Sequence, residues 1–87
     1  MKTDIINKAI QNGWILHFDY VSRDKEISYD RLVQPVEIKE VGKDKILTLY
    51  GQDLKKGLMR SFQLEGIMEA KIIEPEKLKK EFTKNLL

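Results

Sequence analysis

Residues 14–21 read Trp14-Ile15-Leu16-His17-Phe18-Asp19-Tyr20-Val21, and this stretch decides the fold. Its even positions carry large apolar side chains, while the odd positions include polar ones. This period of two, in a segment rich in aromatic and β-branched residues, predicts a half-buried β-strand. The next five residues, 22–26, are all polar or charged and predict an exposed turn, so the strand begins a hairpin.

Four further strands are expected downstream of the turn. The second begins near Ile27 and continues past Pro35, which marks an edge, a bulge or a bend because proline cannot donate to a ladder. Polar segments that contain glycine separate the later strands. The expected strands cover residues 27–41, 45–50, 58–64 and 68–74, with turns or loops at 42–44, 51–57 and 65–67.

A helix is predicted on each side of the strands. Residues 3–12 carry one apolar stripe and end at Gly13, a residue that commonly follows a helix. Residues 75–86 begin with proline, which suits a first helical position, and repeat apolar side chains every four residues. The chain is therefore expected to be one mainly β domain over 1–87: helix 3–12, barrel 14–74 and amphipathic helix 75–86. Five short antiparallel strands with one bend favour a small, partly closed barrel.

Composition narrows the class of protein. The 87 residues include no cysteine, which excludes disulfides and thiolate metal sites, and the net charge is only +2 from 16 basic and 14 acidic residues. Overall charge therefore gives no argument for nucleic-acid binding, and local placement must carry any such case. No stretch is apolar enough for a membrane span or a signal peptide, so we expect a cytoplasmic protein without a membrane partner.

Catalysis has little support in the sequence. There is a single histidine, no serine lies in a nucleophile motif, and no glycine loop has the spacing that cradles phosphates. His17 and Asp19 share a strand face, but no third metal ligand accompanies them. We therefore expect a domain that is not an enzyme, with neither a cofactor nor a metal.

Two arginines are the main candidates for binding. Arg31 and Arg60 each lie in phase with apolar neighbours on a predicted strand, where a guanidinium must find an acceptor or reach solvent. One hypothesis is that both open onto a shared concavity at the barrel mouth and bind a phosphate or carboxylate. The alternative is that each pairs with an acidic residue and seals a barrel end, the candidates being Asp30, Asp53 and Glu65.

Tyrosines and lysines give weaker signals. Tyr20, Tyr29 and Tyr50 could stack bases, although half-buried packing with the hydroxyl at the rim is the simpler interpretation. Lys55 and Lys56 could contact phosphates, or could belong to a solvated loop.

The order of these segments resembles a known family. The chain is similar to a WYL domain, a family common in bacterial regulators, over about residues 9–73. The similarity rests on Ala9-Ile10 with Ile15-Leu16-His17-Phe18-Asp19-Tyr20, on Arg31-Leu32-Val33-Gln34-Pro35, on Ile46-Leu47-Thr48-Leu49-Tyr50-Gly51-Gln52-Asp53 and on Arg60-Ser61-Phe62-Gln63-Leu64-Glu65-Gly66-Ile67.

The resemblance implies an SH3-like or Sm-like barrel that senses ligands, often nucleic acid or nucleotides, and that regulates transcription or defence systems. It also adds Thr48, which aligns with the middle of the Trp-Tyr-Leu triplet, to the candidate ligand-binding residues. The chain departs from the family pattern at that triplet, where only Leu49 survives, and at Gly66, which replaces an arginine. It is expected to be a stand-alone form without a helix-turn-helix.

Two functions follow. The first is a regulatory module that binds single-stranded nucleic acid or a nucleotide-like anion through Arg31 and Arg60 with the neighbouring tyrosines. The second is an adaptor that binds a larger protein or a second copy, as a homodimer or ring, through the barrel or the helix over 75–86.

Overall fold

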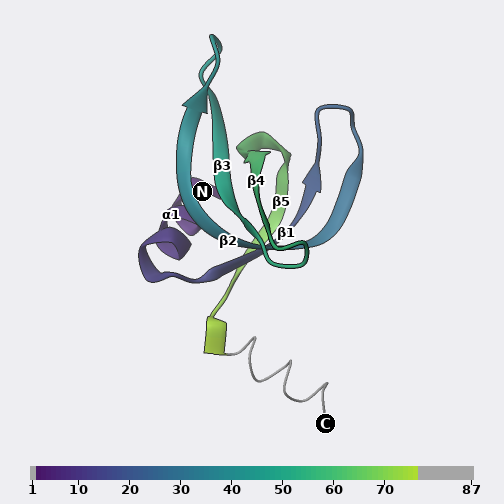
Figure 1. The fold of residues 1–87 in the computed structure, drawn as a ribbon. Coiled ribbons are helices and arrows are strands. Elements are labelled where there is room, and N and C mark those ends of the chain that lie inside the picture. Colours follow the sequence, from purple (N-terminus) through teal and green to yellow (C-terminus); the bar gives the residue numbers. More distant parts are fainter. Residues whose placement is uncertain (1, 77–87) are drawn as a thin grey trace.

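The computed structural model describes residues 2–76, which form one antiparallel sheet and an N-terminal helix (Figure 1). The strand order is β4-β3-β2-β1-β5. The predicted helix over 75–86 lies outside the described residues from position 77 onward, and so does any contact of its apolar stripe with the sheet. The elements are α1 (Lys2–Asn12), β1 (Ile15–Val21), β2 (Ile27–Val41), β3 (Ile46–Asp53), β4 (Leu58–Gln63), the 3-10 turn η1 (Leu64–Gly66) and β5 (Ile67–Ile73).

Several predicted strand boundaries were wrong by one residue, namely the starts of β1 and β3, the end of β4 and both ends of β5, and the end of β3 was wrong by three. β3 continues to Asp53, whereas residues 51–53 were expected in a loop. Gly51 lies inside the strand, where it permits the close approach of β2. A Cβ at this position would come within 2.8 Å of the Gln34 carbonyl oxygen. The next strand, β4, was expected to end at residue 64. It ends at Gln63 instead, and the 3-10 turn η1 follows directly.

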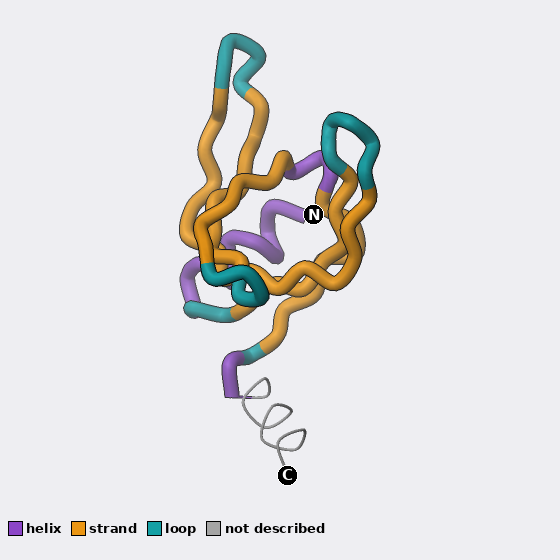
Figure 2. Tube along the Cα trace, turned by 45° about the vertical axis from the view of Figure 1, so that its right-hand side comes forward, coloured by secondary structure: helices purple, strands orange, loops and turns teal. Residues whose placement is uncertain are grey.

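β2 is continuous through Pro35. Its pairing with β3 changes register between Pro35 and Glu37, so the proline occupies a bulge rather than the end of a strand. β1 carries register shifts against both of its neighbours, between Phe18 and Tyr20 on one side and between His17 and Asp19 on the other. These bulges bend the strands, and the sheet curls round most of a ring (Figure 2).

The predicted barrel is not closed. β4 and β5 are the two edges of the sheet and do not pair with each other. The open gap between the β4 edge and β1 with its hairpin is called the seam. The Tyr20 side chain bridges part of it, since the Tyr20 hydroxyl oxygen accepts the Gln63 backbone N–H at 2.9 Å. Tyr20 and Phe62 also pack edge to face, with ring centroids 5.0 Å apart. The aromatic side chains take up the room that a fifth strand pairing would need, so closure by hydrogen bonds stops short.

The core lies inside the curled sheet and under α1, which packs against β2 and β5. The predicted apolar phase of β1 is confirmed, since Leu16 and Phe18 are fully buried. Ile6 and Ala9 bury the apolar stripe of α1, and Lys2 Nζ donates to the Leu64 carbonyl oxygen at 2.7 Å. Within residues 2–76, no helix is long and apolar enough to cross a membrane.

Candidate functional site

A buried carboxylate organises the end of the β3–β4 hairpin. Asp53 is the last residue of β3, and its Oδ1 accepts the backbone N–H groups of Lys55 at 3.0 Å and Lys56 at 3.1 Å. This local bonding is the usual way in which an aspartate initiates a turn. Only 3% of the Asp53 side chain is exposed. Its second oxygen, Oδ2, therefore presents a negative charge inside the protein.

Both predicted arginines face that oxygen. Arg31 Nη2 lies 3.2 Å from Asp53 Oδ2, and Arg60 Nε lies 4.0 Å from the same atom. Strand pairing explains the convergence, because β3 lies between the strands that carry the two arginines. The Arg60 backbone pairs with Gly51, two residues before Asp53.

The two guanidinium groups differ in how tightly they are held. Arg31 is 13% exposed, and its guanidinium carbon lies 5.0 Å from the centroid of the Phe62 ring. Its Nε is buried without a hydrogen-bond partner among the described residues. Arg60 is 36% exposed and only loosely paired. Arg31 is thus a mainly internal group, whereas Arg60 reaches solvent.

The two arginines line one pocket of about 300 Å³. Lys56 adds a third cation to its wall, and Glu26 contributes an acidic group. The pocket occupies the seam between the β4 edge and the β1–β2 hairpin, where the sheet remains open. Its lining comprises Tyr20, Ser22, Glu26, Ile27, Ser28, Arg31, Lys56, Arg60, Ser61 and Phe62.

The geometry combines the two hypotheses made from the sequence. Arg31 and Arg60 do share one hollow, as the binding hypothesis requires, and Asp53 pairs with Arg31, as the alternative requires. Asp30, another candidate partner, instead contacts His17 Nε2 through Oδ1 at 3.0 Å. Whether the hollow binds an anion stays a prediction.

The other predicted residues divide between two places. Tyr20 and Lys56 join the arginines in the pocket, whereas Tyr50 and Thr48 line a neighbouring hollow of about 240 Å³ that Tyr20 borders as well. Thr48 is buried, and its hydroxyl donates to the Ile46 carbonyl oxygen at 3.1 Å. The Lys55 side chain lines neither hollow.

Sequence reasoning missed the contribution of the β1–β2 hairpin. Ser22, Glu26 and Ser28 line the pocket from this hairpin, in which β2 carries an extra residue opposite β1, with Asp30 at a φ of 55°. Asp53 appeared as one of three possible acids. Its position two residues before Lys55, at the start of a turn that ends in Gly57, is the signal that could have singled it out.

Comparisons with known proteins agree with this architecture. Among solved structures, proteasome accessory factor B/C (PafBC) of Arthrobacter aurescens is similar, with a TM-score of 0.68 at 22% sequence identity. The match covers 80% of this chain and 11% of the PafBC chain, so this chain spans only a small part of that protein's length. No curated protein matches the sequence significantly. The sequence matches the WYL domain over residues 2–72. With most of its length in that match and the open five-stranded sheet described above, the chain belongs to the WYL domain family.

Proposed function

We propose that this domain is a non-catalytic binding module for a nucleotide-like anion or for single-stranded nucleic acid, held in the seam pocket. The observation that carries the proposal is the convergence of Arg31, Arg60 and Lys56 on one pocket. The occurrence of WYL domains in regulators that bind ligands or nucleic acids supports it.

Charge and hydrogen bonding both favour an oxyanion in the pocket. Each guanidinium has several N–H donors, yet the two groups share a single carboxylate oxygen of Asp53. Among the described residues, Arg31 Nε is buried without a hydrogen-bond partner, so this donor has no acceptor from the protein. A phosphate offers several oxygens, and a planar guanidinium binds two of them at once.

Preorganisation adds to this argument. Asp53 fixes the Arg31 guanidinium against Phe62, so a ligand would meet a group that is already ordered. Arg60 and Lys56 are the more adaptable cations, and Tyr20 places an aromatic ring on the same pocket. A nucleotide would use the cations for its phosphate and the ring for its base.

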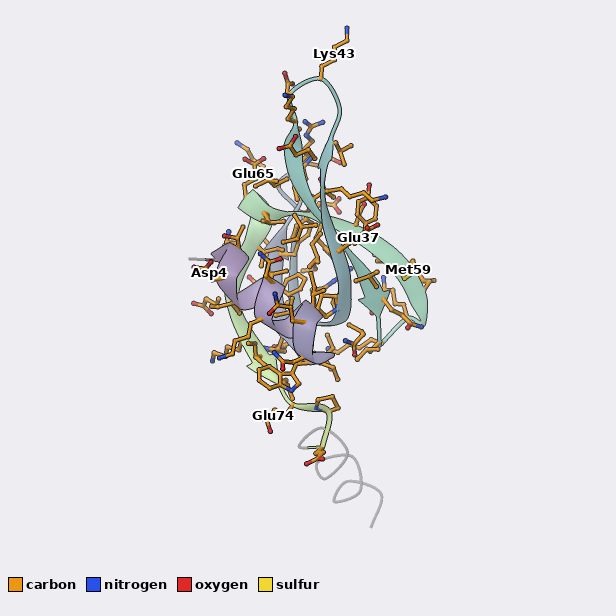
Figure 3. The ribbon with its side chains drawn as sticks, turned by 90° about the vertical axis from the view of Figure 1, so that its left-hand side faces the viewer. Asp4, Glu37, Lys43, Met59, Glu65 and Glu74 are labelled. Atoms are coloured by element: carbon orange, nitrogen blue, oxygen red, sulfur yellow. The ribbon has the colours of Figure 1, made fainter. Side chains whose placement is uncertain are left out.

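The test is a titration of a labelled oligothymidylate of about 15 nucleotides, monitored by fluorescence anisotropy at about 50 and 200 mM salt. ATP in competition would show whether a mononucleotide occupies the same site. The test variants are Arg60→Ala, Arg60→Lys and Lys56→Ala. The matched control is Lys43→Ala, which removes the same charge at the tip of the β2–β3 hairpin (Figure 3), and Lys43 is not among the residues that line the pocket.

We expect two to three phosphate contacts, so wild-type affinity should fall about tenfold between the two salt concentrations. Arg60→Ala should weaken binding by about tenfold, and Arg60→Lys should recover only part of the loss because lysine cannot bind two oxygens in parallel. Lys43→Ala should behave as wild type. Absence of binding to both probes at low salt, or equal losses for Lys56→Ala and Lys43→Ala, would refute the assignment of the pocket.

A further inference from the structure

The β4 edge is open to pairing with another strand. β4 pairs with β3 in a regular register from Leu58 to Gln63, and among residues 2–76 no strand pairs with its other side. The Gln63 N–H points away from β3 to the Tyr20 hydroxyl. Because outward-pointing groups alternate along a strand, the main-chain N–H and C=O groups of Ser61 and Met59 also point to the free side. Two residues of β4 thus present an unpaired ladder.

β5, the strand at the opposite edge of the sheet, is less suited to pairing with another strand. β5 contains Glu69 with φ of 53°, at the point where its pairing with β1 loses register. A bulge and a charged side chain are the usual devices that prevent edge-to-edge pairing. β4 has neither a bulge nor a positive φ, and its one charged residue, Arg60, is the group that an acidic partner would neutralise.

The surface beside β4 indicates the chemistry of a partner. Leu58 is 48% exposed and Met59 is 57% exposed, and both line an open hollow with Tyr50 and Arg60. Met59 lies on the side of the molecule away from Asp4 of α1, so the helix does not cover this edge (Figure 3). The adjoining β3–β4 turn adds the lysines 55 and 56. Apolar contacts with a basic border favour a partner that is apolar and acidic.

A second copy of β4 fits this edge poorly. The antiparallel register that pairs Met59 with Ser61 of another copy places the two Arg60 residues directly opposite each other. Such a position brings side chains closest together, and like charges there are destabilising. In this register charge therefore disfavours a second copy of β4 and favours a strand with an acidic residue opposite Arg60.

We propose that the β4 edge binds an extended peptide as an added antiparallel strand, with an acidic residue opposite Arg60 and an apolar residue opposite Met59. This protein-interaction site goes beyond the anion pocket, although Arg60 borders both. Tyr20 limits the added strand at Gln63, and the β3–β4 turn limits it beyond Leu58. The pairing is short, as suits a transient peptide contact.

The probe is the peptide acetyl-Ser-Thr-Glu-Ile-Val-amide, in which Glu would lie opposite Arg60 and Ile opposite Met59. Binding is followed by amide chemical shifts of the isotope-labelled protein and by hydrogen exchange of the Met59 and Ser61 amides. One matched control replaces Glu by Lys. Two further peptides carry N-methyl groups, either on Thr and Ile, whose N–H groups would face β4, or on Glu and Val, whose N–H groups would face away.

The expected result is slowed exchange at Met59 and Ser61 when the Glu peptide is added. Methylation on Thr and Ile should weaken binding about tenfold or more through two lost hydrogen bonds, and methylation on Glu and Val by less than about twofold. The Lys peptide should bind more weakly than the Glu peptide. A Ser61→Pro variant, which loses an outward N–H but no bond to β3, should also bind about tenfold more weakly.

The proposal is overturned if the Glu peptide does not bind at millimolar concentration, if the two N-methylated peptides bind alike, or if the Lys peptide binds as tightly as the Glu peptide. The peptide comparisons use the wild-type protein, so they decide the question even if Ser61→Pro fails to fold. If the protein fails to bind nucleotide in the pocket assay, the peptide experiments still decide this proposal, because they report on the β4 main chain.

Discussion

Replacing Asp53 by asparagine should be among the most damaging single changes in this domain. The substitution keeps the shape of the side chain and an oxygen that can accept the turn N–H groups of Lys55 and Lys56. It removes the negative charge 3.2 Å from the Arg31 guanidinium, in a place where the Asp53 side chain is only 3% exposed. It also turns an amide donor toward a cation that itself needs acceptors.

The magnitude follows from burial. Removing one partner of a buried ion pair costs about 3–5 kcal/mol, because the other charge remains uncompensated. Arg31 keeps 13% exposure and borders a pocket that water can enter, so we expect the lower end, about 3 kcal/mol. A domain of 87 residues has a free energy of unfolding of about 4–13 kcal/mol. Asp53→Asn should therefore remove a large share of the stability.

Urea unfolding monitored by circular dichroism and Trp14 fluorescence would measure the loss, and a double-mutant cycle would assign it to the pair. Arg31→Met removes the charge but retains an apolar stem against Phe62. The double variant should be more stable than the sum of the single losses predicts, with a coupling energy of about 2 kcal/mol. A cost below about 1 kcal/mol for Asp53→Asn, or additivity within about 0.5 kcal/mol, would refute the reasoning.

Three other substitutions test the packing around the seam. Tyr20→Phe removes the acceptor of the Gln63 N–H and should cost about 1 kcal/mol in urea unfolding, with faster hydrogen exchange at Gln63; unchanged exchange would contradict the bridge. Gly51→Ala would place a Cβ 2.8 Å from the Gln34 carbonyl oxygen and should cost about 1–3 kcal/mol, lowering the melting temperature by several degrees; a wild-type melting curve would contradict the close approach. Gly66→Arg restores the residue of the family pattern, yet a Cβ there would overlap the Val21 carbonyl oxygen and the Tyr20 ring, so it should lower the melting temperature at least as much; a rise would show that η1 packs differently.

Local pattern was enough to predict most of the fold. The alternation in residues 14–21 and the polar turns give the number of strands and the buried phase of β1, which the structure confirms. The boundary near Gly51 was wrong because a glycine inside a strand looks like a turn when only neighbouring residues are considered. The contact that places Gly51 in β3 is with β2, far away in sequence.

The candidate site was harder to predict, for the same reason. Sequence phase showed that Arg31 and Arg60 needed acceptors, but the choice among Asp30, Asp53 and Glu65 depends on strand register. That register includes a bulge after Pro35, and a shift of one residue would turn every later side chain to the other face. The placement of two arginines on one carboxylate is therefore a property of the whole sheet.

The open seam connects the two binding sites proposed for this domain. If β4 paired with a neighbour along its full length, backbone would fill the space beside Arg60, and the outward N–H groups of Met59 and Ser61 would be occupied. The Tyr20 hydroxyl satisfies only Gln63, at one end of the strand. The remaining part of the edge stays open, with three cations on its inner side and apolar residues on its outer side. A barrel left open at this point thus keeps both a cationic hollow for an anion and an unpaired strand for a peptide, and Arg60 stands where the two meet.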